Sequence, residues 1–405
     1  MRTKGYQTMR SPFCVNRRDF VRISGMVGAG LILGSPPIWG QEEKNAVPPA
    51  KPKTNIDEIL KIPRTKQSLP GLFPGKVVEV YDPKVLVSDK PVPDVIRAML
   101  ETGLNRLTGK NAKECFNLFF TTDDIIGIKV NPVGPGLIST NLEVVDAVID
   151  WLVKNGVKKG NIIIWDRFDY MLADAGFTSE RFPGITIAGL QTMDEAAAAG
   201  ESDDNSRWLN QDGTHRSLAN FDQEVFYWAD IDAPQDPAYL NQHVVNGKHS
   251  YFGTLLTKKL TKIINLPVFK NTGNGISMAT KNLGYGVICN TGRLHQPLFF
   301  DVCTEVLAFP AIRDKLVLNI TDGLRGQYDG GPGPAAKFIY PCSTLFFATD
   351  PFALDMVCHN LMVTKRKEMK VSVNEHPRYT EYLHYAERLG LGVVDAKKME
   401  HVRIS

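Results

Sequence analysis

Runs of apolar residues alternate along the chain with segments whose apolar positions recur at helical spacing. Residues 125–130 (IIGIKV) and 161–166 (NIIIWD) are short, β-branched runs with polar neighbours, which predicts two strands. The segment between them carries apolar residues on one helix face: Leu142, Val145, Val148, Ile149 and Leu152. A strand, a helix and a second strand in succession form a βαβ unit, so the two strands should be parallel.

This helix has signals at both of its ends. Thr140 followed three residues later by Glu143 is a capping-box pattern, which predicts that the helix opens at Thr140. Gly156 stands where a glycine after the last helical turn is expected. The helix is therefore predicted to fill the connection between the two strands.

Similar patterns continue on both sides of the βαβ unit. Further strands are predicted at residues 76–83, 262–269, 315–323 and 344–350. Further helices are predicted at residues 94–107, 351–362 and 379–389, and residues 298–309 form another apolar run. The segment at about 200–251 is polar but rich in aromatic residues, which indicates an inserted lid or small subdomain. The expected architecture is one α/β domain over residues 76–405, with a mixed, largely parallel sheet and helices on both faces.

The first 40 residues read as a targeting signal. The paired arginines of NRRDFVR (16–22) precede the mildly apolar run Ile23–Leu33, and the segment resembles a twin-arginine export signal. The apolar run is shorter than the roughly 20 residues that a bilayer span needs. The resemblance implies folded export by the twin-arginine translocase to the periplasm or another extracytoplasmic space. Cleavage near Gly40 and retention of the signal as an anchor both stay open, and no transmembrane span is expected in the mature chain.

Residues 41–75 contain six prolines and few large apolar side chains, so we expect an extended linker between the signal and the domain.

Six of the 47 basic residues and one of the 44 acidic residues lie in the first 40 positions. The rest of the chain has 41 basic and 43 acidic residues, and this near-neutral balance argues against a nucleic-acid partner. The six cysteines form no CxxC pair, which excludes a ferredoxin-type cluster, a zinc ribbon and a c-type haem attachment.

Polar residues after predicted strands are candidates for chemistry, because ligands of α/β sheets collect at the carboxyl ends of parallel strands. Lys129 and Asn131 follow the first strand of the βαβ unit, and Asp166 and Arg167 end the second. The segment from Lys270 to His295 is rich in glycine, asparagine and basic residues. Such a loop can wrap a phosphate or a carboxylate, since its backbone amides approach closely and its lysines supply charge.

Two side chains of the glycine-rich segment suit catalysis. Lys281 could act as a base or as a Schiff-base amine if it is desolvated, and His295 is a natural proton carrier near neutral pH. A structural hydrogen-bonding role is the alternative for His295.

Two carboxylates in the last third of the chain complete the candidate set. Asp322 is predicted to end a strand, with an irregular loop over residues 322–334 (DGLRGQYDGGPGP). Asp350 before Pro351 reads as a helix N-cap. Asp355 is the only charged residue in the otherwise apolar stretch 351–363. A buried carboxylate needs a partner, and we expect a lysine of the glycine-rich segment to supply it.

The order of these segments resembles the family called domain of unknown function 362, over about residues 125–360. The resemblance rests on GIKVN, the strand that ends in Lys270, TKNLGYG, His295, TDG with a Gly/Pro-rich loop, and DPFALD. Thr272 stands where many members carry a histidine, which weakens a metal-ligand role there. The resemblance implies a shared site but no activity or substrate, and it selects these residues: Lys129, Asn131, Lys270, Lys281, Asn282, His295, Asp322 and Asp355.

The leading interpretation is an exported enzyme that binds a small anionic organic ligand. Lys129, Lys270 and Lys281 would hold the anion with the help of Asn131 and Asn282, Asp322 and Asp355 would fix the lysines, and catalysis would use three residues: His295, Lys281 and Asp322.

Two alternatives stay open. One is a non-catalytic binding or assembly factor for an extracytoplasmic redox complex. The other is a metal-dependent hydrolase or oxidoreductase with ligands drawn from His295, Asp322, Asp355, His215, His243 and His249. The sequence does not decide whether a metal or another cofactor is bound.

Overall fold

A computed structural model describes residues 51–191, 218, 220–231, 247–295 and 298–405. The predicted signal at 1–40 and most of the predicted insert at 200–251 lie outside these residues. None of the described helices is both long enough and apolar enough to cross a bilayer.

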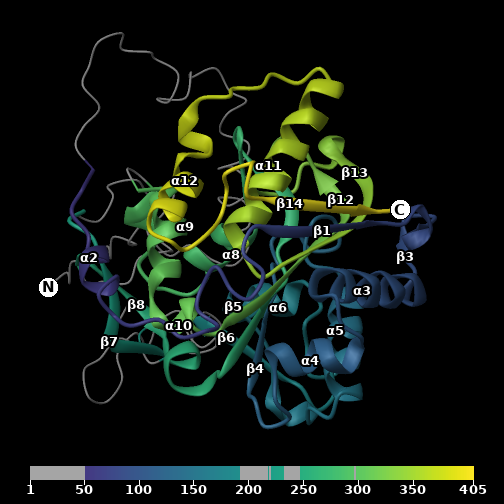
Figure 1. The fold of residues 1–405 in the computed structure, drawn as a ribbon, viewed down its shortest axis with the longest axis horizontal. Coiled ribbons are helices and arrows are strands. Elements are labelled where there is room, and N and C mark those ends of the chain that lie inside the picture. Colours follow the sequence, from purple (N-terminus) through teal and green to yellow (C-terminus); the bar gives the residue numbers. More distant parts are fainter. Residues whose placement is uncertain (1–50, 192–217, 219, 232–246, 296–297) are drawn as a thin grey trace, which may run out of the picture.

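The described strands form a ten-stranded mixed sheet with a parallel half (Figure 1). Parallel pairing joins β6 (Thr186–Gln191), β5 (Ile162–Phe168), β4 (Ile126–Lys129), β9 (Lys262–Asn265) and β12 (Leu316–Gln327) in that order. The sheet continues beyond β12 with β13 (Ile339–Ala348), β1 (Lys76–Tyr81) and β14 (Glu400–Ile404). β13 is antiparallel to both neighbours. The α/β fold and the mixed, mostly parallel sheet are therefore confirmed.

Several short strands extend or flank this sheet. β10 (Val268–Thr272) pairs with the distal part of β12 and with β11 (Gly275–Ile276). Two small antiparallel pairs lie apart from it: β2 (Leu86–Val87) with β3 (Lys90–Pro91), and β7 (Phe221–Trp228) with β8 (His249–Gly253). β7 and the first residues of β8 belong to the predicted insert.

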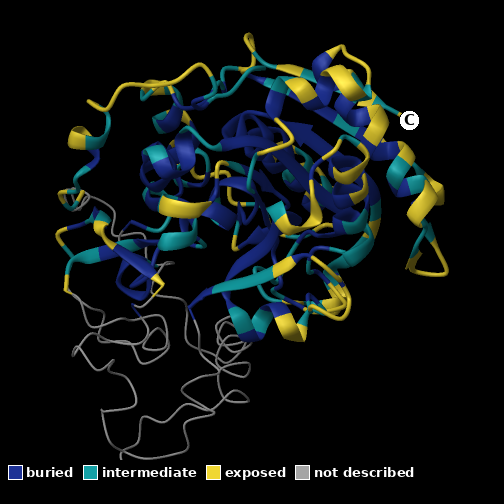
Figure 2. Cartoon of the chain, turned by 90° about the horizontal axis from the view of Figure 1, so that it is seen from below, coloured by how far each residue is buried: buried dark blue, intermediate teal, exposed yellow. Residues whose placement is uncertain are grey.

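Helices cover both faces of the sheet because side chains alternate along its strands. Ile162 and Ile164 of β5 pack in one core, whereas Ile163 and Trp165 pack in another. The first core also contains residues of α3 (Pro93–Thr108), α4 (Ala112–Phe119) and α5 (Leu142–Lys154). The opposite face carries α8 (Ala279–Gly284), α9 (Asp301–Glu305), α10 (Pro310–Arg313), α11 (Pro351–Glu368) and α12 (Glu381–Arg388). Figure 2 shows the buried residues concentrated in the sheet and on the inner sides of these helices. The short helices α2 (Ile56–Ile59) and α6 (Asp169–Asp174) complete the set.

The start of α5 differs from the prediction. Asn141 is its N-cap residue, and no side chain caps the helix there. The Thr140 hydroxyl instead accepts a hydrogen bond from the Asn131 amide (2.8 Å) and donates one to the Leu266 carbonyl (2.8 Å). The capping box is therefore not formed, because Thr140 links the loops that follow β4 and β9. Asp350 does cap α11, as predicted, through the amides of Phe352 and Ala353.

The predicted irregular loop at 322–334 is wrong in its first half. β12 continues through Asp322 to Gln327, with β13 on one side and β10 on the other. The glycines here are needed for packing: a Cβ on Gly326 would lie 2.9 Å from the Tyr340 ring and 3.0 Å from the Phe269 ring. Sequence composition suggested a loop, whereas two neighbouring strands stabilise an extended backbone.

Residues 51–75 are not a free tether. Leu69 is buried, and its amide donates to the Arg313 carbonyl (2.9 Å). The Arg64 guanidinium donates to the carbonyls of Gly390 and Leu389, and the Lys51 ammonium pairs with Glu305 (2.6 Å). This segment therefore packs on the α/β body as a strap that contacts several distant parts of the sequence.

Candidate functional site

The carboxyl ends of three parallel strands bring buried polar side chains together. Lys129 at the end of β4 stands in register with Asn265 of β9 on one side and with Trp165 of β5 on the other. Asp166 follows Trp165, and all three polar residues are buried. This arrangement is what the parallel βαβ unit predicts for residues at strand ends.

Lys129 is held in place by three acceptors. Its ammonium forms an ion pair with Asp166 and donates to the Val130 carbonyl (2.9 Å) and to Oδ1 of Asn282 (3.2 Å). Burial lowers the pKa of Lys129, and the Asp166 carboxylate opposes this effect. Asp166, not Asp322 or Asp355, is thus the acidic partner of this lysine.

A chain of buried asparagines connects the strand ends to α8. Asn282 donates to Oδ1 of Asn265 (2.8 Å), and Asn265 donates to Oδ1 of Asn319 in β12 (2.9 Å). Asn131 donates to Oδ1 of Asn282 (3.1 Å). Because buried amides are costly unless they are paired, this network fixes the position of α8 relative to the sheet. Asn265 and Asn319 escaped the sequence analysis, although each directly follows apolar residues in a buried strand.

Lys270 lies in β10 and is also fully buried. Its ammonium donates to Oδ1 of Asn131 (2.9 Å) and to the carbonyls of Val133 (3.2 Å) and Ile138 (3.3 Å). Burial lowers its pKa to about 7, and the nearby charges of Lys281 and Lys129 act in the same direction. The loop between β4 and α5 thus wraps around this side chain.

Lys281 differs from the other two lysines. Its Nζ makes no hydrogen bond or ion pair with the described residues. It lies instead 5.4 Å from the ring centre of Tyr285 and 5.6 Å from that of Phe299. Burial lowers the pKa of Lys281. Among the described residues, the rings of Tyr285 and Phe299 are therefore what orients this ammonium.

His295 packs against the same two rings. Its ring centre is 4.8 Å from that of Tyr285 and 5.8 Å from that of Phe299. Nδ1 lies 2.9 Å from the Thr291 carbonyl, which can only accept, so Nδ1 carries the hydrogen. Burial, followed by the charge of Lys281, lowers the pKa of His295 to about 3. The imidazole is therefore neutral at physiological pH.

Arg167 at the end of β5 adds another cation next to His295. Its guanidinium donates to the Thr291 hydroxyl and to Oε1 of Gln191 (3.4 Å). The charge of Arg167 contributes to the lowered pKa of His295. We refer below to Lys129, Lys270, Lys281 and Arg167, with His295, as the basic cluster.

Asp322 and Asp355 do not fix the lysines, which corrects the expectation. Asp355 of α11 accepts hydrogen bonds from the amides of Ala279 (2.8 Å) and Thr280 (3.0 Å) and from the Thr280 hydroxyl (2.6 Å). Asp322 accepts from the amide (2.7 Å) and the side chain (2.9 Å) of Asn141 and from the Leu324 amide (3.1 Å). Each carboxylate is satisfied by amides at the start of a helix and so needs no cation.

Burial raises the pKa of both carboxyl groups, that of Asp355 to about 6. Both residues position backbone segments: Asp355 holds the start of α8, and Asp322 holds the start of α5. The sequence analysis thus chose two residues that matter to the site's architecture but assigned them the wrong partners.

The ligands expected for a metal site are not gathered among the described residues. No three His, Cys, Asp or Glu side chains of the described ranges lie close enough to hold one ion. His249 packs against the rings of Phe226 and Tyr251, whereas His215 and His243 lie outside the described residues. Within the described ranges, His295, Asp322 and Asp355 are therefore not brought together as metal ligands.

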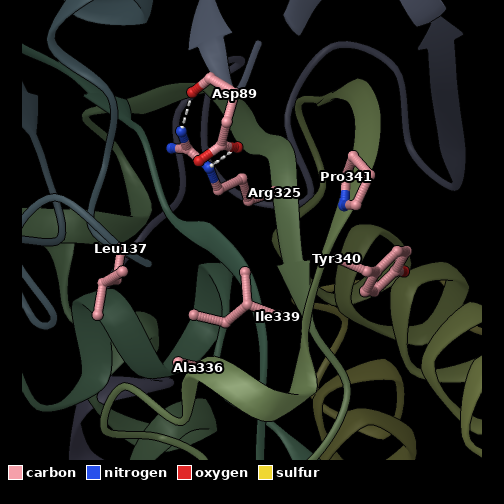
Figure 3. A pocket seen from close by; sticks show the side chains of 7 residues that line it. All are labelled: Asp89, Leu137, Arg325, Ala336, Ile339, Tyr340 and Pro341. Atoms are coloured by element: carbon pink, nitrogen blue, oxygen red, sulfur yellow. Dashed lines mark hydrogen bonds and ion pairs between the residues drawn. The ribbon is translucent and has the colours of Figure 1, made fainter.

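Two surface hollows are lined by none of the residues of the basic cluster. Figure 3 shows the first, of about 220 Å³, where Asp89 and Arg325 form an ion pair (2.9 Å) at one end and Leu137 and Ile339 supply an apolar side. The second, of about 430 Å³, lies between α11 and α12 and is lined by His359 among others. None of the residues that line either hollow is a candidate site residue of the sequence analysis.

Comparison with known proteins adds one finding. A family model described as "Domain of unknown function (DUF362)" matches residues 126–360, which is more than half of the chain. The matched range begins at β4 and ends within α11, and it includes every residue of the basic cluster. No curated protein matches the chain.

Proposed function

The chain belongs to the DUF362 family, a domain of unknown function, and we propose that it binds a small organic anion at the basic cluster and acts on it as an enzyme. The main observation behind this proposal is that the three buried lysines outnumber the carboxylates that pair with them. Asp166 is the one carboxylate of the described residues that forms an ion pair with any of the three lysines. Lys270 donates only to neutral oxygens, and Lys281 donates to none of the described groups.

An anionic ligand would offset this imbalance. Buried charges are costly unless they are paired, and the lowered pKa values of the three lysines show that cost. A carboxylate or phosphate near Lys281 would favour the charged form of each neighbouring lysine. The fixed positions of Lys129 and Lys270 mean that the site provides positive potential without rearranging, which is typical of a preorganised anion site.

The residues of the site divide naturally into two roles. Lys281 lies against the rings and is the lysine that would contact the anion directly. Lys129 and Lys270 provide charge behind it and hold Asn131 and Asn282. His295 is neutral with hydrogen on Nδ1, so its lone pair lies on Nε2. A bound anion would raise its lowered pKa and so favour its role as an acceptor of a substrate proton. Acid–base catalysis on an anion is the reaction class that these residues support best.

We place this activity outside the cytoplasm, on the basis of the sequence alone. The paired arginines at 17–18 and the apolar run after them support export of the folded chain. Retention of the signal would leave the same domain anchored at the membrane surface.

Anion-dependent thermal unfolding of the full chain tests the proposal. Inorganic phosphate and succinate serve as probes, with the wild type, Lys281→Met and a matched exposed control, Lys84→Met. A ligand at 100 times its Kd stabilises a protein by about 2.7 kcal/mol, so a clear rise in Tm is expected for the wild type and the control. Lys281→Met should reduce the affinity by about tenfold or more.

Equal shifts in all three proteins would show that the anion binds elsewhere and would remove Lys281 from the site. The absence of any shift with either probe in the wild type would contradict anion binding at the cluster.

A further inference from the structure

We propose that Lys281 forms a Schiff base with a ketone or aldehyde group of the bound anion, so that the substrate class is a small oxo acid. This inference rests on the proposed function, because the same cluster must first bind the anion. It goes further by naming the reacting atom of the protein, Nζ of Lys281, and the functional group of the substrate that it attacks.

The first observation is the difference in hydrogen bonding among the three lysines. Nζ of Lys129 and Nζ of Lys270 each donate to three acceptors of the protein, which fixes the position of both groups. Nζ of Lys281 has no such partner among the described residues. A lysine can attack a carbonyl carbon only through a lone pair that faces the substrate, and among the three lysines Lys281 is the one whose Nζ is not held by acceptors of the described residues.

The second observation is the surroundings of Lys281. Two aromatic rings lie against its ammonium at 5.4 and 5.6 Å. Ring faces attract a cation by about 0.5–2 kcal/mol. Burial opposes this attraction and lowers the pKa of the group, and the positive charge of Lys270 lies nearby. A desolvated lysine beside a second cation is the usual arrangement of an amine that must react in its neutral form.

The third observation is a proton carrier beside the amine. His295 packs on the same rings as Lys281, and the charge of Lys281 acts on the pKa of His295. The Nδ1 hydrogen faces the Thr291 carbonyl, so the lone pair of the ring lies on Nε2. The neutral form of Lys281, which is the form that reacts, removes one of the charges that lower the pKa of His295 and so favours proton uptake. Lys281 and His295 thus supply the nucleophile and the base that imine formation needs.

The reaction balances without an oxidant or a reductant. Nζ of Lys281 forms a bond to the carbonyl carbon, and Nε2 of His295 moves one proton from that nitrogen to the carbonyl oxygen, which gives a carbinolamine. Nε2 of His295 accepts a proton from the nitrogen and returns it to the hydroxyl group. The carbon–oxygen bond then breaks and water leaves, so that amine and carbonyl give imine and water. The acid group of the substrate remains near Lys270 and Lys129, where the positive potential stabilises it.

Reductive trapping tests this step. The full chain is incubated with pyruvate or glyoxylate and then with sodium borohydride, and the modified residue is located by peptide mass spectrometry. We expect a reduced adduct on Lys281 in the wild type and in Lys84→Met. Lys281→Arg, which keeps the charge but cannot form an imine, should give none at this position.

His295→Gln should still form the adduct, with a rate about 100-fold lower, because the amine remains but its base is lost. An unchanged rate in this variant would remove His295 from the step. As a control for folding, the circular dichroism spectrum of each variant must match that of the wild type. If Lys281→Met fails to fold, Lys281→Arg provides a second variant, which retains the positive charge.

The outcomes separate this inference from the proposed function. If succinate and phosphate stabilise the wild type and Lys281→Arg but neither oxo acid gives an adduct on Lys281, the Schiff base is overturned and anion binding stands. If adducts form to the same extent on Lys84 and Lys281, the reaction is non-specific and the inference is also overturned. If neither stabilisation nor an adduct is seen, both proposals fail.

Discussion

At the scale of single residues, Lys270 shows how burial controls charge. Its ammonium has three acceptors, yet all of them are neutral oxygens. Neutral acceptors compensate only part of the lost hydration, and two other lysines lie close by. The pKa of Lys270 therefore falls to about 7, so its charge changes within the physiological range.

This value predicts a pH dependence of anion affinity. Below about pH 7 Lys270 is protonated and adds positive potential to the site, whereas above it that charge is lost. We expect the affinity for sulfate, whose own charge is constant in this range, to fall roughly tenfold between about pH 6 and about pH 8. Isothermal titration calorimetry measures this directly. Lys270→Met should bind weakly with little pH dependence, and an equally flat profile in the wild type would contradict the assignment.

At the scale of elements, α8 carries the reactive part of the site. Lys281 and Asn282 lie on this helix of six residues, which is too short to be stable alone. Asp355 of α11 holds its first amides, and the Asn282–Asn265 hydrogen bond ties it to β9. The position of Lys281 is therefore set by contacts with two other elements rather than by helix propensity.

Replacing Asp355 tests this dependence. Asp355→Ala leaves the amides of Ala279 and Thr280 and the Thr280 hydroxyl without their acceptor. We expect the free energy of unfolding to drop by about 3 kcal/mol in urea denaturation. Asp355→Asn keeps one side-chain oxygen as an acceptor and should lose less. The exposed control Asp123→Ala should stay within about 0.5 kcal/mol of the wild type, and a similar small effect in Asp355→Ala would refute the capping role.

At the scale of the whole molecule, the strap formed by residues 51–75 links the start of the described chain to distant elements. Its main polar anchor is Glu305 of α9, which is fully buried. This carboxylate accepts hydrogen bonds from Lys51 (2.6 Å), from the Tyr227 hydroxyl (2.8 Å) and from the Tyr385 hydroxyl (3.1 Å). One side chain thus joins the strap, β7 and α12.

The two ends of the Lys51–Glu305 pair should contribute unequally. The Lys51 side chain is 39% exposed, so Lys51→Met should cost about 1 kcal/mol of stability or less. Glu305→Ala leaves two tyrosine hydroxyls and an ammonium without their acceptor and should cost about 3 kcal/mol or more. Urea denaturation measures both losses, and limited proteolysis should show faster cleavage within residues 51–75 of Glu305→Ala. Equal losses for the two variants would contradict this account.

Much of the fold followed from local patterns, because side-chain periodicity is a property of neighbouring residues. The βαβ unit, the helix at 94–107 and the Asp350 cap could be predicted because each depends on contacts within a short stretch. The strand character of residues 322–327 could not, since it depends on pairing with β10 and β13. The packing of residues 51–75 likewise depends on partners hundreds of positions away.

The same division applies to the site. The sequence alone determined that basic residues would gather at strand ends, because parallel strands place their carboxyl ends along one edge of the sheet. Only the tertiary structure decided which groups pair. Asp166 forms the ion pair with a lysine that was expected of Asp322 and Asp355. Asp322 and Asp355 instead accept hydrogen bonds from backbone amides at helix starts. Hydrogen-bond partners depend on distances of a few ångströms, and local sequence patterns do not set such distances between elements.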